Sequence, residues 1–303
     1  MQMNFDVVDT PPRPAATVVI LRNAPQGMET FLLRRHGAAA VLGGAHVFPG
    51  GKVDPSDADA GLHTRLDQAP AALAARLNEP ATAAPDAAAL FVAAMREVVE
   101  ECGVLFAHGA DADTAAALVK LLRAQVPFAS ASAALSLRLD AASLHPWSRW
   151  ITPRIPTVTR ARFDTRFFIA ALPEGQHALH DTAESSDGIW LRPRDALQHY
   201  WDGAIEFAPP QIMTLAHLAQ YTTVQQALAS AQAQRPILVE PAPFNDDDGA
   251  RITCYPGDAR HPVTLCQMPG PTRLVFRNQR FEPPDGFEAL FLSAAPSGKR
   301  TAP

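Results

Sequence analysis

The sequence predicts an α+β fold, a sandwich of helices packed on a β-sheet. Two short β-prone runs open the chain, a long helix-forming segment follows, and strand signals then return before further helices. No uninterrupted alternation of strands and helices is present, and the glycines of 42–51 do not fit the dinucleotide-binding fingerprint. With 303 residues, 47% of them hydrophobic, the chain is long enough for a sizeable core.

The N-terminal strand signals lie at 15–23 and 28–36, with the turn sequence APQG between them. Because β-branched and apolar residues flank a short polar turn, these runs predict a hairpin. A third short strand is expected at 45–48, immediately before Pro49, Gly50 and Gly51.

A strong helix is predicted over 86–102, since the segment consists mostly of helix formers. Asp86, just after Pro85, is the expected N-cap, and Gly103 is the expected C-terminal stop. A short helix at 71–78 and a linker at 79–86 precede it.

Downstream of this helix the pattern alternates between helices and strands. Helices are predicted at 113–125, 131–142, 194–200 and 209–220, and strands at 162–173, 188–193, 251–256, 261–268 and 272–277. The chain from about residue 206 is expected to form an extension to a main domain of residues 12–205.

The helix at 86–102 carries two different faces. Phe91, Met95, Val98 and Cys102 fall on one narrow arc at helical spacing, which should face the core. Glu97, Glu100 and Glu101 occupy another arc, where like charges three and four residues apart repel. A hard divalent cation would reverse that repulsion, although an arbitrary acidic face is more often simply solvated.

Composition excludes several classes of protein. A net charge of −5 argues against a general nucleic-acid binder. The N-terminus lacks the basic and apolar regions of a signal peptide, and no apolar run is long enough for a membrane span. Three scattered cysteines predict reduced thiols rather than zinc ligands or disulfides, so a cytoplasmic location is expected.

The segments FPGG and REVVEECGV, read together, resemble the Nudix box, G-x5-E-x7-R-E-U-x-E-E-x-G-U. Its second half matches in full over 96–104, and Gly51 begins its first half. Asp57 stands where the family has glutamate, and residues 58–95 replace the seven-residue spacer. A loop tolerates such an insertion, because closure entropy grows only logarithmically with length. The split box resembles the Nudix subgroup that contains the mammalian peroxisomal coenzyme A diphosphatase.

The resemblance implies a Nudix-type α/β/α sandwich with a mixed central sheet, an insertion at about 58–85, extra helices at about 107–145 and a C-terminal extension. It implies a metal-dependent hydrolase that cleaves the pyrophosphate of a small nucleoside diphosphate derivative, best matched by coenzyme A or acyl-coenzyme A. ADP-ribose, NADH, a nucleotide sugar or a nucleoside triphosphate are alternative substrates. A non-catalytic Nudix-fold binding module is the alternative from another class.

Site roles also follow from the resemblance. Glu97, Glu100 and Glu101 are the expected ligands of Mg²⁺ or Mn²⁺, with the Gly51 carbonyl as a further ligand. Arg96 is expected to organise the site by pairing with Asp57 and a box glutamate. The general base is left open between a box glutamate and an acid from elsewhere in the sheet.

Further candidates lie outside the box. Glu184 and Asp187, just before a strand, are secondary candidates for an additional acid, with an ordinary polar turn as the alternative. Four arginines are candidates for phosphate binding, with a surface role as the alternative. Arg34 and Arg35 follow the strand FLL, and Arg162 and Arg166 alternate on one face of RFDTRFF. No nucleic-acid or membrane partner is expected, and a homodimer is left open.

Overall fold

The fold is that of a computed structural model that describes residues 6–37, 43–156, 161–180 and 185–292. Its centre is an eight-stranded mixed sheet with the strand order β3-β2-β1-β6-β5-β8, in which β4 also pairs with β1 and β7 with β2. The strands are β1 (Arg13–Ala24), β2 (Gly27–Arg35), β3 (His46–Val47), β4 (Gly50–Lys52), β5 (His145–Ile151), β6 (Phe163–Ala171), β7 (Ser185–Leu191) and β8 (Ile237–Val239).

The sheet is mixed because β1 pairs antiparallel with β2 on one side and parallel with β6 on the other. Strands β1 and β2 pair antiparallel up to Ala24 and Gly27, where Gly27 takes a φ of +125°. This confirms the predicted hairpin. Strand β1 also runs parallel to β6 over nine residue pairs, from Arg13 with Phe163 to Leu21 with Ala171.

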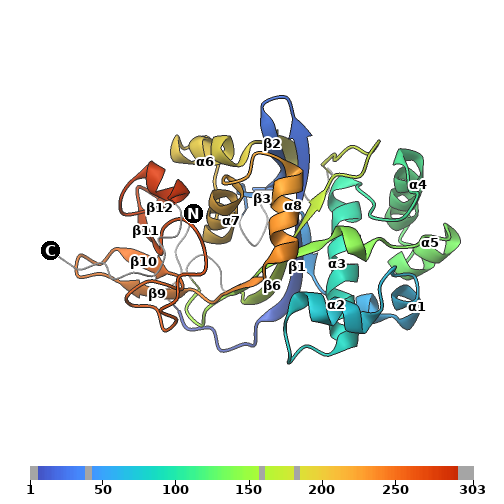
Figure 1. The fold of residues 1–303 in the computed structure, drawn as a ribbon, viewed down its shortest axis with the longest axis horizontal. Coiled ribbons are helices and arrows are strands. Elements are labelled where there is room, and N and C mark those ends of the chain that lie inside the picture. Colours follow the sequence, from blue (N-terminus) through green and yellow to red (C-terminus); the bar gives the residue numbers. More distant parts are fainter. Residues whose placement is uncertain (1–5, 38–42, 157–160, 181–184, 293–303) are drawn as a thin grey trace.

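One face of the sheet is covered by helices from the middle of the chain (Figure 1). These are α1 (Ala60–His63), α2 (Pro70–Leu77), α3 (Ala84–Cys102), α4 (Ala112–Arg123) and α5 (Phe128–Ala134). Short 3₁₀ turns flank this group, with η1 (Pro55–Ala58) before α1 and η2 (Ala141–Ser143) after α5. Helix α3 crosses the centre of this layer and supplies most of its core contacts.

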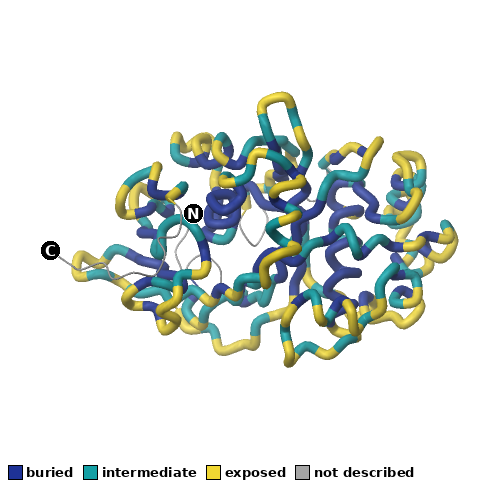
Figure 2. The backbone as a smooth tube through the Cα atoms, viewed as in Figure 1, coloured by how far each residue is buried: buried dark blue, intermediate teal, exposed yellow. Residues whose placement is uncertain are grey.

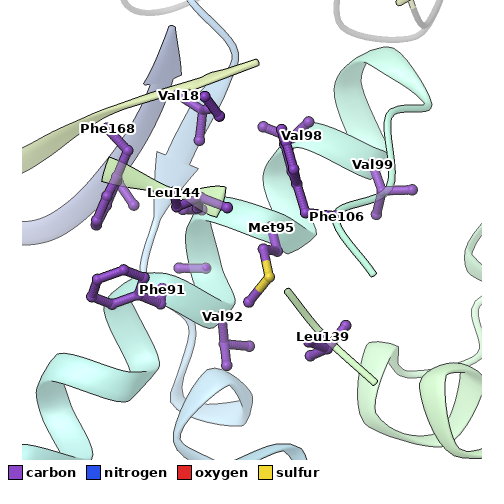
Figure 3. Close-up of a cluster of buried hydrophobic side chains, with 14 of the residues drawn as sticks. Val18, Phe91, Val92, Met95, Val98, Val99, Phe106, Leu139, Leu144 and Phe168 are labelled. Atoms are coloured by element: carbon purple, nitrogen blue, oxygen red, sulfur yellow. The ribbon is translucent and has the colours of Figure 1, made fainter. Parts of the chain in front are cut away.

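The long helix packs as its sequence pattern predicts. Phe91, Met95, Val98 and Cys102 are all buried. Phe91 meets Phe168 of β6 with ring centroids 4.8 Å apart, and Figure 3 shows this cluster. Such aromatic burial anchors the helix against the sheet.

The opposite face carries helices from the later part of the chain. These are α6 (Pro193–Trp201), α7 (Pro209–Leu218) and α8 (Val224–Ala233). A second, four-stranded sheet packs on this side, with β9 (Ala242–Asn245), β10 (Arg251–Cys254), β11 (Arg273–Arg277), β12 (Arg280–Glu282) and the turn η3 (Phe287–Phe291). The molecule is therefore an α/β/α sandwich, buried at its middle layer and exposed on its outer helices (Figure 2).

The insertion between the two halves of the box is packed firmly onto the body. Glu79, just after α2, accepts hydrogen bonds from Nε and Nη2 of Arg166 at 3.0 and 2.5 Å. It also lies 3.1 Å from Nη1 of Arg149, and both arginines contact Asp164. A nearly buried ion-pair network thus joins the insertion to β5 and β6.

Several local expectations were wrong. Helix α3 begins at Ala84 with Ala83 as N-cap, and Asp86 lies in its first turn, because Pro85 fits the first turn of a helix. Residues 261–268 form no strand. Seven of the described helices and strands had no expectation from sequence: β4, β5, β8, β9, β12, α1 and α8.

The predicted boundary after residue 205 does not coincide with a break in packing. Strand β8 pairs parallel with β5, through Ser148 with Ile237 and Trp150 with Val239. The extension therefore supplies a strand to the main sheet, and the boundary stays a prediction. Among the described residues, no helix combines the length and apolarity needed to cross a lipid bilayer.

Candidate active site

The C-terminal half of α3 presents the three box glutamates. Gly103 ends the helix with a φ of +69°, a left-handed conformation that suits glycine. Glu101 is buried, Glu97 is partly buried and Glu100 is exposed. The acidic face therefore runs from the protein interior to solvent within one helical turn.

The glycine turn at 50–51 lies directly against these glutamates. Strand β4 pairs antiparallel with β1, Thr17 opposite Gly50 and Ala16 opposite Gly51. The main-chain N–H of Gly50 donates to Oε2 of Glu101 at 2.8 Å. The two halves of the box therefore meet in space although the insertion separates them in sequence.

Both glycines are required by close contacts. A Cβ on Gly51 would lie 2.4 Å from the carboxylate of Glu97. A Cβ on Gly50 would lie 2.4 Å from the carbonyl oxygen of Ala16, and Gly50 has a φ of +153°. No other residue type fits either position without moving the turn or the glutamate.

Arg96 connects the parts of the site. Its Nη1 donates to Oε1 of Glu97 and Oε2 of Glu100, each at 2.9 Å. Its Nη2 donates to the carbonyl of Lys52 at 3.1 Å. Burial lowers the pKa of Arg96, but the hydrogen bond to Asp57 and the charges of Glu97, Asp57 and Glu100 outweigh burial and raise this pKa overall. The guanidinium therefore stays charged and fixes two of the glutamates.

Asp57, directly before the insertion, completes this arrangement. Oδ1 accepts from Nε of Arg96 at 2.8 Å and Oδ2 from Nη2 at 3.0 Å. Oδ2 also accepts from the main-chain N–H of Asp54 at 2.7 Å, which closes a capping box on η1. Only 1% of Asp57 is exposed. Aspartate therefore reaches Arg96 despite being one methylene shorter than the glutamate of the Nudix box.

The residues present suit a hard divalent cation. Carboxylates and main-chain carbonyls are the oxygen ligands that Mg²⁺ and Mn²⁺ prefer. Gly51 leaves the carboxylate of Glu97 the space that a Cβ would fill. Three carboxylates on one helical face, partly neutralised by a single arginine, leave net negative charge for a cation.

The structure gives the other candidate residues different surroundings. Arg166 is bound to Glu79 and Asp164, and Arg162 donates to the carbonyls of Thr152 and Thr10. These two buried arginines serve the fold rather than an open phosphate site.

The remaining candidates lie along β2 and β7. Arg34 is exposed and paired in register with Asp187, whose side chain accepts from the N–H of Gly188. Arg35 is partly buried on the neighbouring position of β2. Glu184 lies outside the described residues.

A second group of side chains that could bind a metal ion was not predicted from the sequence. His108 lies 3.2 Å from Asp67 and 4.0 Å from Asp140. Both oxygens of Asp67 also accept main-chain N–H groups, from Ala141 and Ala142. The carboxylate of Asp67 thus holds the insertion against the segment before β5. Residues so far apart in the chain give no local signal in the sequence, so this contact was not predicted.

Sequence reasoning missed two residues, one that contacts the site from within the box and one that attaches the insertion to the sheet. Glu79 and Lys52 had no expected role, yet one anchors the insertion and the other supplies a carbonyl to Arg96. The only local signal was the position of Lys52 directly after the glycine turn.

The mixed sheet between helical layers and the reassembled glycine–glutamate site define a Nudix hydrolase. The model of the NUDT19 Nudix domain matches residues 12–218, and the chain belongs to that family.

Individual relatives agree with this assignment. The human acyl-coenzyme A diphosphatase NUDT19 is 29% identical over 235 residues, covering 66% of this chain and 62% of that protein. The Xenopus laevis protein of the same name is 23% identical over 338 residues, covering 93% and 87%. The crystal structure of a Nudix hydrolase from Alicyclobacillus acidocaldarius has a TM-score of 0.58 and 29% identity, covering 73% of this chain and 97% of that one. The chain thus spans less than two thirds of the human relative.

Proposed function

We propose that this protein hydrolyses the pyrophosphate bond of coenzyme A or acyl-coenzyme A with Mg²⁺ or Mn²⁺. The observation that carries the proposal is the contact of Gly50 and Gly51 with Glu101 and Glu97, which assembles the site across the insertion. The names of the human and frog relatives, acyl-coenzyme A diphosphatases, support the substrate class.

Hydrolysis of a pyrophosphate needs neutralised phosphate charge and an oriented water molecule. Glu97, Glu100 and Glu101, with the Gly51 carbonyl, would hold the cation. The bound cation would neutralise phosphate charge and lower the pKa of a water ligand. Arg96 fixes the carboxylates of Glu97 and Glu100, and the Gly50 N–H fixes that of Glu101.

Asp57 acts through Arg96 in this proposal. It holds the guanidinium from the side opposite the glutamates, so that Nη1 can reach both Glu97 and Glu100. Asp57 is therefore a positioning residue, and its effect on turnover comes through the geometry of the glutamates.

The test is a hydrolysis panel with Mg²⁺ and Mn²⁺ over coenzyme A, octanoyl-coenzyme A, NADH, ADP-ribose and nucleoside triphosphates. We expect the highest kcat/KM with the coenzyme A derivatives and products cleaved at the pyrophosphate. A preference for ADP-ribose or NADH would show that the proposed substrate is wrong, while the proposed hydrolysis of a pyrophosphate bond would stand. No turnover of any compound would favour the binding-module alternative.

Glu101→Gln tests the metal site. The variant should lose about 100-fold or more in kcat, because one anionic ligand is removed from the cation site. It should also lose Mn²⁺ binding measured by calorimetry. Glu174→Gln, at an exposed position beyond β6, is the matched control and should behave as wild type. Full activity and Mn²⁺ binding in Glu101→Gln would contradict the assignment.

We also propose a cytoplasmic location and a homodimer. The three cysteines are free thiols, which supports the proposed cytoplasmic location. A homodimer is kept as a proposal that sedimentation analysis tests directly.

A further inference from the structure

A pocket of about 440 Å³ adjoins the box glutamates. Glu100 and Glu101 form part of its wall, together with α4 and the segment 176–180. Its volume lies in the range of small-molecule sites. The catalytic glutamates and this pocket therefore share a boundary.

The wall formed by α4 is aliphatic. Ala112, Ala115, Ala116 and Val119 line it from one face of the helix. Val99 of α3 continues the same surface. Small aliphatic side chains leave a smooth channel that suits a flexible hydrocarbon chain.

The segment 176–180 forms another part of the pocket wall. Leu179 is 69% exposed, an unusual exposure for a large apolar side chain. Its main-chain N–H donates to the carbonyl of Cys102 at 3.0 Å, and Ala178 beside it is buried. Gln176 is buried and bonds to the main chain of Leu105 in both directions. The main chain that carries Leu179 is thus hydrogen-bonded in place at the pocket wall.

Two cations lie in the pocket wall beside the two glutamates. Lys120 and Arg123 line it from the last turn of α4. These cations, close to Glu100 and Glu101, suit a ligand that carries phosphate groups beside an apolar chain. The aromatic rings among the described lining residues are the imidazoles of His177 and His180, and none is a phenyl, phenol or indole ring.

We propose that this pocket binds the acyl-pantetheine arm of the substrate while its pyrophosphate lies at the box glutamates. The inference rests on the proposed function and adds the place of the acyl chain, against Val99, Leu179 and α4. Each methylene buried in the pocket should raise affinity about fourfold. Leu179 and the alanines of α4 then determine chain-length preference.

Leu179→Glu tests this by placing a carboxylate against the acyl chain. Wild type should hydrolyse octanoyl-coenzyme A with a higher kcat/KM than coenzyme A. The variant should lose at least about tenfold in kcat/KM for octanoyl-coenzyme A relative to coenzyme A, mainly through KM. Ala116→Phe, which fills the pocket from an exposed position on α4, should have the same effect.

Leu265→Glu is the matched control, since Leu265 is 58% exposed and is not part of the pocket. It should keep the wild-type preference. A second readout is competitive inhibition of coenzyme A hydrolysis by S-octanoyl-pantetheine, which lacks a pyrophosphate. Inhibition should weaken in Leu179→Glu and persist in Leu265→Glu.

The outcomes separate the pocket from the activity. If coenzyme A derivatives are hydrolysed but Leu179→Glu and Ala116→Phe keep the octanoyl preference, the pocket assignment is overturned and the proposed function stands. If only ADP-ribose or NADH is hydrolysed, the proposed substrate fails, and the pocket assignment fails with it.

Discussion

Arg96 and Asp57 form a two-point ion pair across 39 positions of sequence, with Nε to Oδ1 at 2.8 Å and Nη2 to Oδ2 at 3.0 Å. Bidentate pairing of this kind fixes direction as well as distance. Because Arg96 also binds Glu97 and Glu100, Asp57 holds the acidic face of α3 in place from a position directly before the insertion.

Lengthening Asp57 to the glutamate of the Nudix box should harm this protein. Asp57 is almost fully buried and satisfied at both oxygens, so Asp57→Glu must push Arg96 or η1 aside. We expect a loss of about 1–3 kcal/mol in the free energy of unfolding, measured by urea denaturation. Asp113→Glu, exposed on α4, is the control. A stabilised Asp57→Glu would show that the insertion adapts to either acid.

Adding a methyl group at Gly51 should impair turnover more than folding. The new Cβ would lie 2.4 Å from the Glu97 carboxylate, so this side chain must move. A displacement of about 1 Å at a reacting centre costs on the order of 100-fold in rate. Gly37→Ala is the control, since an added Cβ there meets no atom of the described residues within 4 Å apart from Gly37 and its chain neighbours. Equal kcat in both variants would remove Glu97 from the site.

The insertion should depend on Glu79 for its attachment. Glu79→Gln removes one of the two carboxylates that contact both Arg166 and Arg149, in a nearly buried setting. Breaking such a network should lower the free energy of unfolding by about 3 kcal/mol.

The matched control for Glu79 is the exposed pair of Arg194 and Glu288. Glu288→Gln should cost less than about 1 kcal/mol, because solvent screens that pair. Both variants are compared by thermal and urea unfolding. Equal losses would mean that burial does not strengthen the network at Glu79.

Acid should destabilise the protein partly through His217. Burial lowers the pKa of His217 from 6.5 to about 4, beside Trp147 at 4.3 Å between ring centroids. Unfolding lets the ring take a proton below pH 6.5, so its contribution is complete above that pH and is lost as pH falls toward 4. Between pH 7 and 5 the loss should be about 2 kcal/mol.

His217→Phe isolates this share of the acid sensitivity. Its free energy of unfolding should fall less than that of wild type between pH 7 and 5. His199→Phe, at an exposed position of α6, should keep the wild-type pH dependence. An unchanged profile in His217→Phe would show that other groups govern the acid transition.

The sequence predicted features that depend on local pattern. The hairpin of β1 and β2, helix α3 with its buried arc and the stop at Gly103 follow from periodicity and glycine chemistry. The proximity of Gly51 to Glu97 was predicted only through the resemblance to the Nudix box, and the structure has this contact.

Contacts between distant segments could not be predicted. Glu79 sits in a stretch that reads as a linker, yet it binds Arg166, 87 positions away. Arg162 and Arg166 looked like phosphate ligands because alternation along a strand shows a shared face but not the partner opposite it. Short strands such as β8 carry too few residues for a periodic signal.

Strand β8 has a consequence for any shortened version of the chain. The family model ends at residue 218, whereas β8 covers one side of β5 through residues 237–239. A protein cut at 218 would leave β5 as a bare sheet edge with unpaired main-chain groups, which is a template for self-association. We therefore expect that the Nudix domain has to be produced together with β8. By covering the edge of the sheet at β5, the extension limits self-association as well as completing the fold.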